Sequence, residues 1–239
     1  MKYIDRLSDF ISANFLKRWQ WCRQCNKHAR KCLESIDLLE KSMDETQSTI
    51  NNLKKCKDGG MDKDLDKLIR CYESIHSFFE FDGKLILLSL EFYSSFKFLL
   101  QSKSNWEYRF FARRIYTLMY ETRKGFLDPI GRPFHEIISL VGDDSYKSFD
   151  IIRGEFCHFI DKLDKKDLKE IRNRDVHKED GFLDQKRYIE NMSIKESLDI
   201  ILDYRDKLMN LQTAMMSLLV ALNNLTVKTT FDIVHKTNK

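Results

Sequence analysis

A short segment late in the chain, Ile171-Arg172-Asn173-Arg174-Asp175-Val176-His177, carries side chains suited to phosphate chemistry. Arginine presents a planar fork that holds a phosphate through two hydrogen bonds and does not lose its charge. Histidine titrates near pH ~6.5, so it can exchange a proton with a ribose hydroxyl or a leaving 5′ oxygen. Asn173 and His177 are spaced i, i+4 and would share a helix face, where the amide could hold the imidazole or a phosphate oxygen. These residues indicate chemistry at a ribose phosphate.

At this heptad the sequence resembles the HEPN superfamily, whose ribonuclease members most typically carry Arg-Asn-x-x-x-His with a small apolar residue before the His. Arg172, Asn173, Val176 and His177 match that form position by position, over seven of the 239 residues. The resemblance implies an α-helical bundle, usually dimeric, and a metal-independent endoribonuclease that leaves a 2′,3′-cyclic phosphate. Many such proteins act as toxins or in defence, and other members have lost the catalytic pair and only bind.

The chemistry of RNA cleavage gives a separate reason to expect a homodimer. In-line attack by a 2′-hydroxyl needs a base, an acid and a cation at the phosphate, and one motif supplies a single histidine. A twofold interface that places two copies of His177 and Arg172 in one groove would supply the missing partner. We therefore expect His177 to act as the general acid/base, Arg172 to clamp the phosphate and Asn173 to position the reacting groups.

A basic stretch near the start of the chain predicts an extension of the RNA-binding surface. Between Ile11 and Cys32 the chain has six basic residues and no acidic one, interleaved with Trp19 and Trp21; the six are Lys17, Arg18, Arg23, Lys27, Arg30 and Lys31. Basic and aromatic side chains together neutralise phosphates and stack on bases. A second basic group lies within residues 97–133. The alternative is a solvated helix face with its aromatic side chains turned inward.

The same stretch contains four soft metal ligands, Cys22, Cys25, His28 and Cys32. Zinc needs four donors that converge at about 2.0–2.3 Å on one centre. On a continuous helix the first and last of these residues are separated by about 15 Å of rise, so only neighbouring members could share an ion. We expect no metal or other cofactor, and metal binding by this set stays an alternative.

The elements that position these residues are predicted to be helices. Residues 1–58 contain no Pro or Gly and form one very long helix or two, ended by Gly59-Gly60. A second helix begins at Asp62 or Asp64 and breaks at Asp82-Gly83, before an apolar and central helix over 84–102. Another runs from Asn105 to about Leu127, where the only segment with Pro follows.

The second half of the chain is predicted to contain shorter helices and one long final helix. Helices are expected at 134–141, 145–163 and about 165–177, and a polar loop over 178–191. Ser193 and Glu196 form a capping box that opens a helix running past residue 225. The prediction is a single all-α domain over 1–239, a helical bundle with long N- and C-terminal helices and an extended N-terminal helical region of about 1–58.

The composition favours a water-soluble chain in the cytoplasm. Lys and Arg number 41 against 37 Asp and Glu, and the 17 Phe, 9 Tyr and 3 Trp are enough to fill a core and exclude a disordered tail. The start has no apolar signal-peptide region, and Leu208–Val227, although free of charge, carries too many polar residues for a membrane span. The expected partners are RNA, a second copy of the chain and an inhibitor protein. The alternative function is a non-catalytic helical bundle that binds a protein or nucleotide.

Overall fold

The computed structural model describes residues 15–58, 63–127, 137, 140–141, 143–163, 168–171 and 182–237. Within those ranges every secondary-structure element is a helix, which confirms the all-α bundle with long helices near both ends of the chain. The elements are α2 (Phe15–Asp58), α3 (Lys63–Gln101), α4 (Asn105–Glu121), the π-helix η1 (Thr122–Leu127), α6 (Asp143–Lys162), α8 (Phe182–Asn191) and α9 (Ile194–Thr237). The prediction of one domain over 1–239 stays a prediction.

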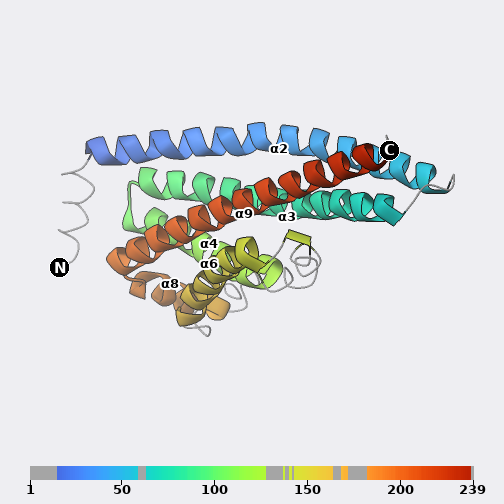
Figure 1. The fold of residues 1–239 in the computed structure, drawn as a ribbon. Coiled ribbons are helices and arrows are strands. Elements are labelled where there is room, and N and C mark those ends of the chain that lie inside the picture. Colours follow the sequence, from blue (N-terminus) through green and yellow to red (C-terminus); the bar gives the residue numbers. More distant parts are fainter. Residues whose placement is uncertain are drawn as a thin grey trace.

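Helices α2 and α3 form a long antiparallel hairpin (Figure 1). The start of α2 lies beside the end of α3, where Trp21 and Phe96 have ring centroids 6.3 Å apart. At the opposite end Lys54 Nζ lies 2.7 Å from a carboxylate oxygen of Glu73. Over residues 15–58 the sequence left open one helix or two, and the structure shows one of 44 residues. Without Pro or Gly nothing in that stretch interrupts the main-chain hydrogen bonds.

The predicted break at Asp82-Gly83 is wrong, because α3 continues through both residues to Gln101. A Cβ added to Gly83 would lie 3.0 Å from Leu39 Cδ2, so the glycine allows α2 to approach α3 closely. Glycine in a helix interior costs about 1 kcal/mol relative to alanine. Burial of Phe78 and Leu85, which are 0% exposed on either side of the glycine, outweighs that cost.

Helix α9 packs antiparallel to α3 along most of its length (Figure 1). The aromatic rings of Phe92 and Tyr204 lie 5.4 Å apart, and Gln212 Nε2 donates to Ser89 Oγ at 2.8 Å further along the pair. The predicted helix start is confirmed, because Ser193 Oγ accepts from the main-chain N–H of Glu196 at 3.4 Å. No helix in the described part of the chain is both long and apolar enough to cross a bilayer.

The loop predicted over 178–191 is wrong from residue 182 onwards, where α8 runs to Asn191. Its polar residues include Gln, Lys, Arg and Glu, which are good helix formers, and Tyr188 packs against the core. The turn after α8 is fixed by Arg109 on α4, whose Nε donates to Met192 O at 3.1 Å. Of the helices expected at 134–141 and 165–177, residues 137, 140–141 and 168–171 are described and helical, and the others lie outside the described residues.

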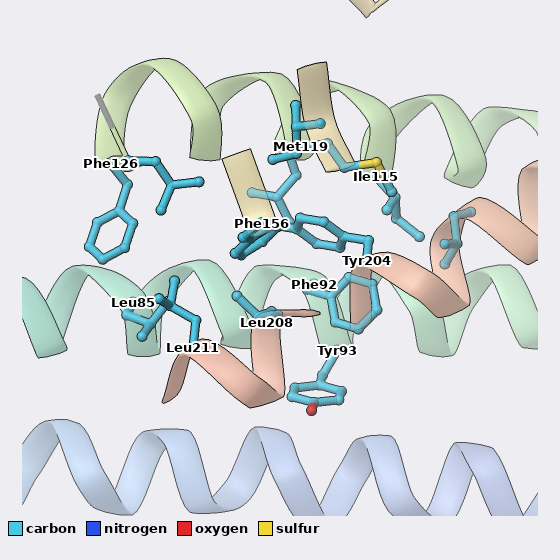
Figure 2. Close-up of a cluster of buried hydrophobic side chains, with 14 of the residues drawn as sticks. Leu85, Phe92, Tyr93, Ile115, Met119, Phe126, Phe156, Tyr204, Leu208 and Leu211 are labelled. Atoms are coloured by element: carbon cyan, nitrogen blue, oxygen red, sulfur yellow. The ribbon is translucent and has the colours of Figure 1, made fainter. Parts of the chain in front are cut away.

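The core lies where α3, α4, α6 and α9 meet (Figures 1 and 2). Tyr204 of α9 stands at its centre, with Phe92 on one side and Phe156 of α6 at 5.5 Å on another. Its hydroxyl lies 2.8 Å from Thr122 Oγ1, which also donates to Leu118 O. The hydroxyl groups of Tyr204 and Thr122 therefore both have hydrogen-bond partners, although apolar side chains surround them.

Candidate nucleic-acid interface

The catalytic candidates Arg172, Asn173 and His177 lie outside the described residues. The helical segment just before them, residues 168–171, is described and is fixed to the core through Leu168 and Ile171, which are 3% and 6% exposed. Helix α8 begins five residues after His177. Along the chain, residues 172–177 therefore follow a buried helical segment and precede α8.

The first basic residues of the N-terminal stretch have different surroundings. Lys17 lies in α2, and its side chain is outside the described residues. Arg18 points towards the end of α3, where its Nε donates to Leu100 O at 2.7 Å and its second nitrogen donates to Leu100 O and, at 3.3 Å, to Ser102 O. The guanidinium thus binds main-chain carbonyls across the α2–α3 contact. Participation of either residue in RNA binding stays a prediction.

The remaining four basic residues, Arg23, Lys27, Arg30 and Lys31, are exposed along α2. The guanidinium carbon of Arg23 lies 5.7 Å from the ring centroid of Trp19, which is 54% exposed. Arg30 forms an exposed ion pair with Glu34 at 2.9 Å. Trp19, Arg23, Lys27 and Lys31 are spaced four residues apart, so they follow one another along the outer side of the helix. Of the two tryptophans, only Trp21 is turned inward, against Phe96.

Sequence reasoning missed a group of exposed aromatic side chains at the end of α3 and the start of α4. Phe98 at the end of α3 is 50% exposed, and Trp106 and Phe110 on α4 are 46% and 59% exposed. The ring of Phe98 stacks on Phe111 at 5.5 Å, and Phe111 meets Phe110 edge-on at 5.2 Å. The i, i+4 spacing of Trp106 and Phe110 places both rings on the same face of a helix. A search of the sequence for charged residues does not detect this pattern.

The cysteine and histidine group is part of the α2–α3 contact. Burial raises the pKa of Cys25 to about 12 and also raises the pKa values of Cys22 and Cys32. His28 stacks on Tyr93 with ring centroids 4.7 Å apart, and burial, then the charges of Lys31 and Lys27, lower its pKa. These shifts disfavour thiolates at neutral pH, and thiolate is the form that binds metal.

Within the ranges that the structure describes, no three Cys, His, Asp or Glu side chains are grouped so that they could hold a metal ion. All four members of the Cys22–Cys32 set fall inside those ranges. The described side chains instead offer positive charge and aromatic rings at one end of the molecule, where α2 begins, α3 ends and α4 begins (Figure 1). No family model, curated protein or solved structure matches this chain.

Proposed function

We propose that this protein is a metal-independent endoribonuclease of HEPN type that works as a homodimer in the cytoplasm, in a toxin or defence system. The observation that carries the proposal is the segment Arg172-Asn173-x-x-Val176-His177. Two features of the structure support it. In the part of the chain that the structure describes every element is a helix, as the resemblance implies, and the buried pair Leu168 and Ile171 fixes the chain immediately before Arg172.

In the proposed reaction, a histidine removes the proton from a ribose 2′-hydroxyl, and that oxygen attacks the adjacent phosphorus atom. The bond from phosphorus to the 5′ oxygen breaks, and the leaving oxygen takes a proton from a second acid. The products are a 2′,3′-cyclic phosphate and a 5′-hydroxyl, so atoms and protons balance. Two copies of His177 would serve as base and acid, and Arg172 would stabilise the charge that develops on the phosphate.

The test is cleavage of mixed cellular RNA by the full chain in excess EDTA, with the 3′ ends of the fragments mapped. Cleavage that survives chelation and leaves cyclic phosphate ends is the expected result for the wild-type protein. The His177→Ala variant is expected to lose it. His158→Ala is the matched control because that histidine is exposed on α6.

Equal fragmentation by wild-type and His177→Ala protein would overturn the catalytic assignment. Absence of cleavage by either protein would favour the alternative, a helical bundle that binds a protein or nucleotide without catalysis. Circular dichroism of each variant separates lost chemistry from lost folding, since the native chain is strongly helical. The RNA target and any inhibitor protein follow from sequencing the fragments and from co-purification with the inactive variant.

A further inference from the structure

One end of the bundle has a surface on which aromatic rings and positive charge occur together. We define the aromatic–basic surface as Phe98, Trp106 and Phe110 with Lys97, Lys103 and Arg114. Trp106, Phe110 and Arg114 succeed one another at four-residue spacing along α4 and are exposed. Phe98 joins this row from α3 through its stack on Phe111. Rings from two helices thus form one group rather than isolated exposed residues.

The charge at this surface is strongly one-sided. Around the three rings the exposed or half-exposed basic side chains are Lys97, Lys103, Arg109 and Arg114, and the acidic side chain among them is that of Glu107. Arg113 in the same segment is buried and does not contribute to this surface. The carboxylate of Glu107 accepts a hydrogen bond from the main-chain N–H of Lys103 at 2.6 Å, so it serves the start of α4. A partner that complements this surface must be an anion.

The basic row of α2 begins at the same end of the α2–α3 hairpin as this surface. Lys97 Nζ lies 6.0 Å from the ring centroid of Phe98, and its charge also acts on the thiol of Cys22 in α2. Arg18 joins α2 to the last residues of α3. The exposed Trp19 with Arg23 above it therefore lies at the same end of the hairpin, and Figure 1 shows the start of α2 beside the end of α3.

We propose that the aromatic–basic surface binds single-stranded RNA, with unpaired bases stacked on Phe98, Trp106 and Phe110 and phosphates held by the basic side chains around them. Single strands expose the flat faces of their bases, and such faces stack on aromatic rings whatever the sequence. An unpaired strand offers each ring the flat face of a base and each basic side chain a phosphate, so one ligand uses both kinds of side chain. The choice of RNA as the ligand rests on the proposed function, whereas binding itself requires no cleavage.

The test measures binding by the full-length His177→Ala protein, so that cleavage does not consume the probe. The probe is a fluorescein-labelled single-stranded oligouridine of about 20 nucleotides, long enough to cover several stacking sites. Trp106→Ala/Phe110→Ala is expected to raise Kd by about fivefold or more, the range measured for the loss of base–aromatic stacks. Lys103→Ala is expected to lower the slope of log affinity against log salt by about 0.7, the value for one phosphate contact with a single strand.

The matched control is Phe231→Ala/Lys228→Ala, an exposed aromatic ring and an exposed lysine near the end of α9, far along the chain from this surface. The control is expected to bind the probe as the parent does. Circular dichroism checks that each variant keeps its helices, and the single Lys103→Ala change tests the proposal even where the double variant folds poorly. Unchanged affinity and unchanged salt slope in the surface variants would overturn the proposal.

The outcomes also separate this inference from the proposed ribonuclease. If the wild type cleaves RNA under chelation and the surface variants bind the probe as their parent does, only the RNA-binding surface is refuted. If the wild type cleaves nothing but the surface variants lose binding, the surface stands and the ribonuclease assignment fails. If the surface variants change self-association by sedimentation and leave RNA affinity unchanged, the rings form an interface between copies of the chain and the proposal is overturned.

Discussion

Arg18 of α2 caps the C-terminus of α3 by donating from Nε to the main-chain oxygen of Leu100 at 2.7 Å, across 82 residues of sequence. The last carbonyls of a helix have no partner within the helix. Here Leu99 O accepts from the N–H of Ser102 at 3.2 Å and Phe98 O accepts from its hydroxyl at 3.1 Å. The guanidinium supplies the partner for Leu100 O and places a positive charge at the negative end of the helix dipole.

Arg18→Ala is expected to lower the free energy of unfolding by about 1–3 kcal/mol, because a charge-assisted hydrogen bond to a half-buried carbonyl is lost. Urea denaturation followed by circular dichroism measures the change. Lys27→Ala is the matched control, since Lys27 is exposed two turns further along the same helix. Equal stability of the two variants would show that the cap contributes nothing.

Tyr204→Phe is expected to lower the free energy of unfolding by about 1–2 kcal/mol, because the buried hydroxyl forms a hydrogen bond with Thr122 Oγ1 that phenylalanine cannot form. Tyr204 is 0% exposed, so the effect is not diluted by solvent. Tyr146→Phe is the comparison, since the hydroxyl of Tyr146 lies 3.5 Å from Asp150 at a partly exposed position. If Tyr204→Phe lowered the free energy of unfolding no more than Tyr146→Phe does, the stabilising role of the Tyr204 hydroxyl would be refuted.

Because of Asp82, the free energy of unfolding is expected to fall as the pH rises. Burial raises the pKa of its carboxyl from 3.8 to about 6, so the folded state holds the proton more tightly than the unfolded chain does. Between about pH 4 and pH 6 the folded state binds more protons, and the free energy of unfolding therefore decreases with pH across that window. The stabilising contribution is complete below the unfolded pKa and is lost as pH rises through the folded pKa.

Asp82→Asn is expected to remove this slope and to raise the free energy of unfolding at pH 7 by about 1 kcal/mol, a value discounted for the partial exposure of the side chain. Denaturation at a series of pH values measures it, with Asp203→Asn on the exposed side of α9 as the control. A variant that keeps the wild-type slope between pH 4 and 6 would contradict the assignment to Asp82.

The six cysteines are expected to react with a thiol reagent in an order set by burial. Cys56 is exposed, whereas Cys25, Cys32 and Cys71 are buried and burial raises the pKa of each of the three thiols. Because the thiolate is the reactive form, Cys56 should be alkylated first and these three only on unfolding. Mass spectrometry of peptides from protein labelled with and without urea reports the order. Early labelling of Cys25 in native protein would refute the α2–α3 packing.

Within the proposed ribonuclease, Arg172→Ala is expected to lower kcat/KM by about 10²–10³, the cost of losing one group that stabilises transition-state charge. Arg172→Lys should recover part of that loss, because lysine keeps the charge but not the bidentate geometry. Asn173→Ala should lower the rate less and move its pH profile, since the amide is assigned to hold the imidazole. If Arg172→Ala cleaved RNA at the wild-type rate, the assignment of Arg172 to the phosphate would be wrong.

The sequence by itself determined the helical content of the long elements and one of their boundaries. The absence of Pro and Gly before Gly59 predicts helix up to residue 58, as one helix or two, and the pair Ser193 and Glu196 marks where α9 begins. These features act locally, through the main chain and through side chains within one turn, so a single sequence reveals them. The all-α class followed from the same local patterns.

Only the tertiary structure decided which local signals were overridden and which side chains face outward. Helix α3 continues through Gly83 because Phe78 and Leu85 on either side of it are buried, and α8 exists where the local sequence predicted a loop. The basic stretch separates into Arg18, which caps α3, and residues such as Arg23 that remain exposed. Such outcomes depend on contacts between residues tens of positions apart. The free energy of those contacts exceeds the small differences in helix propensity between residue types.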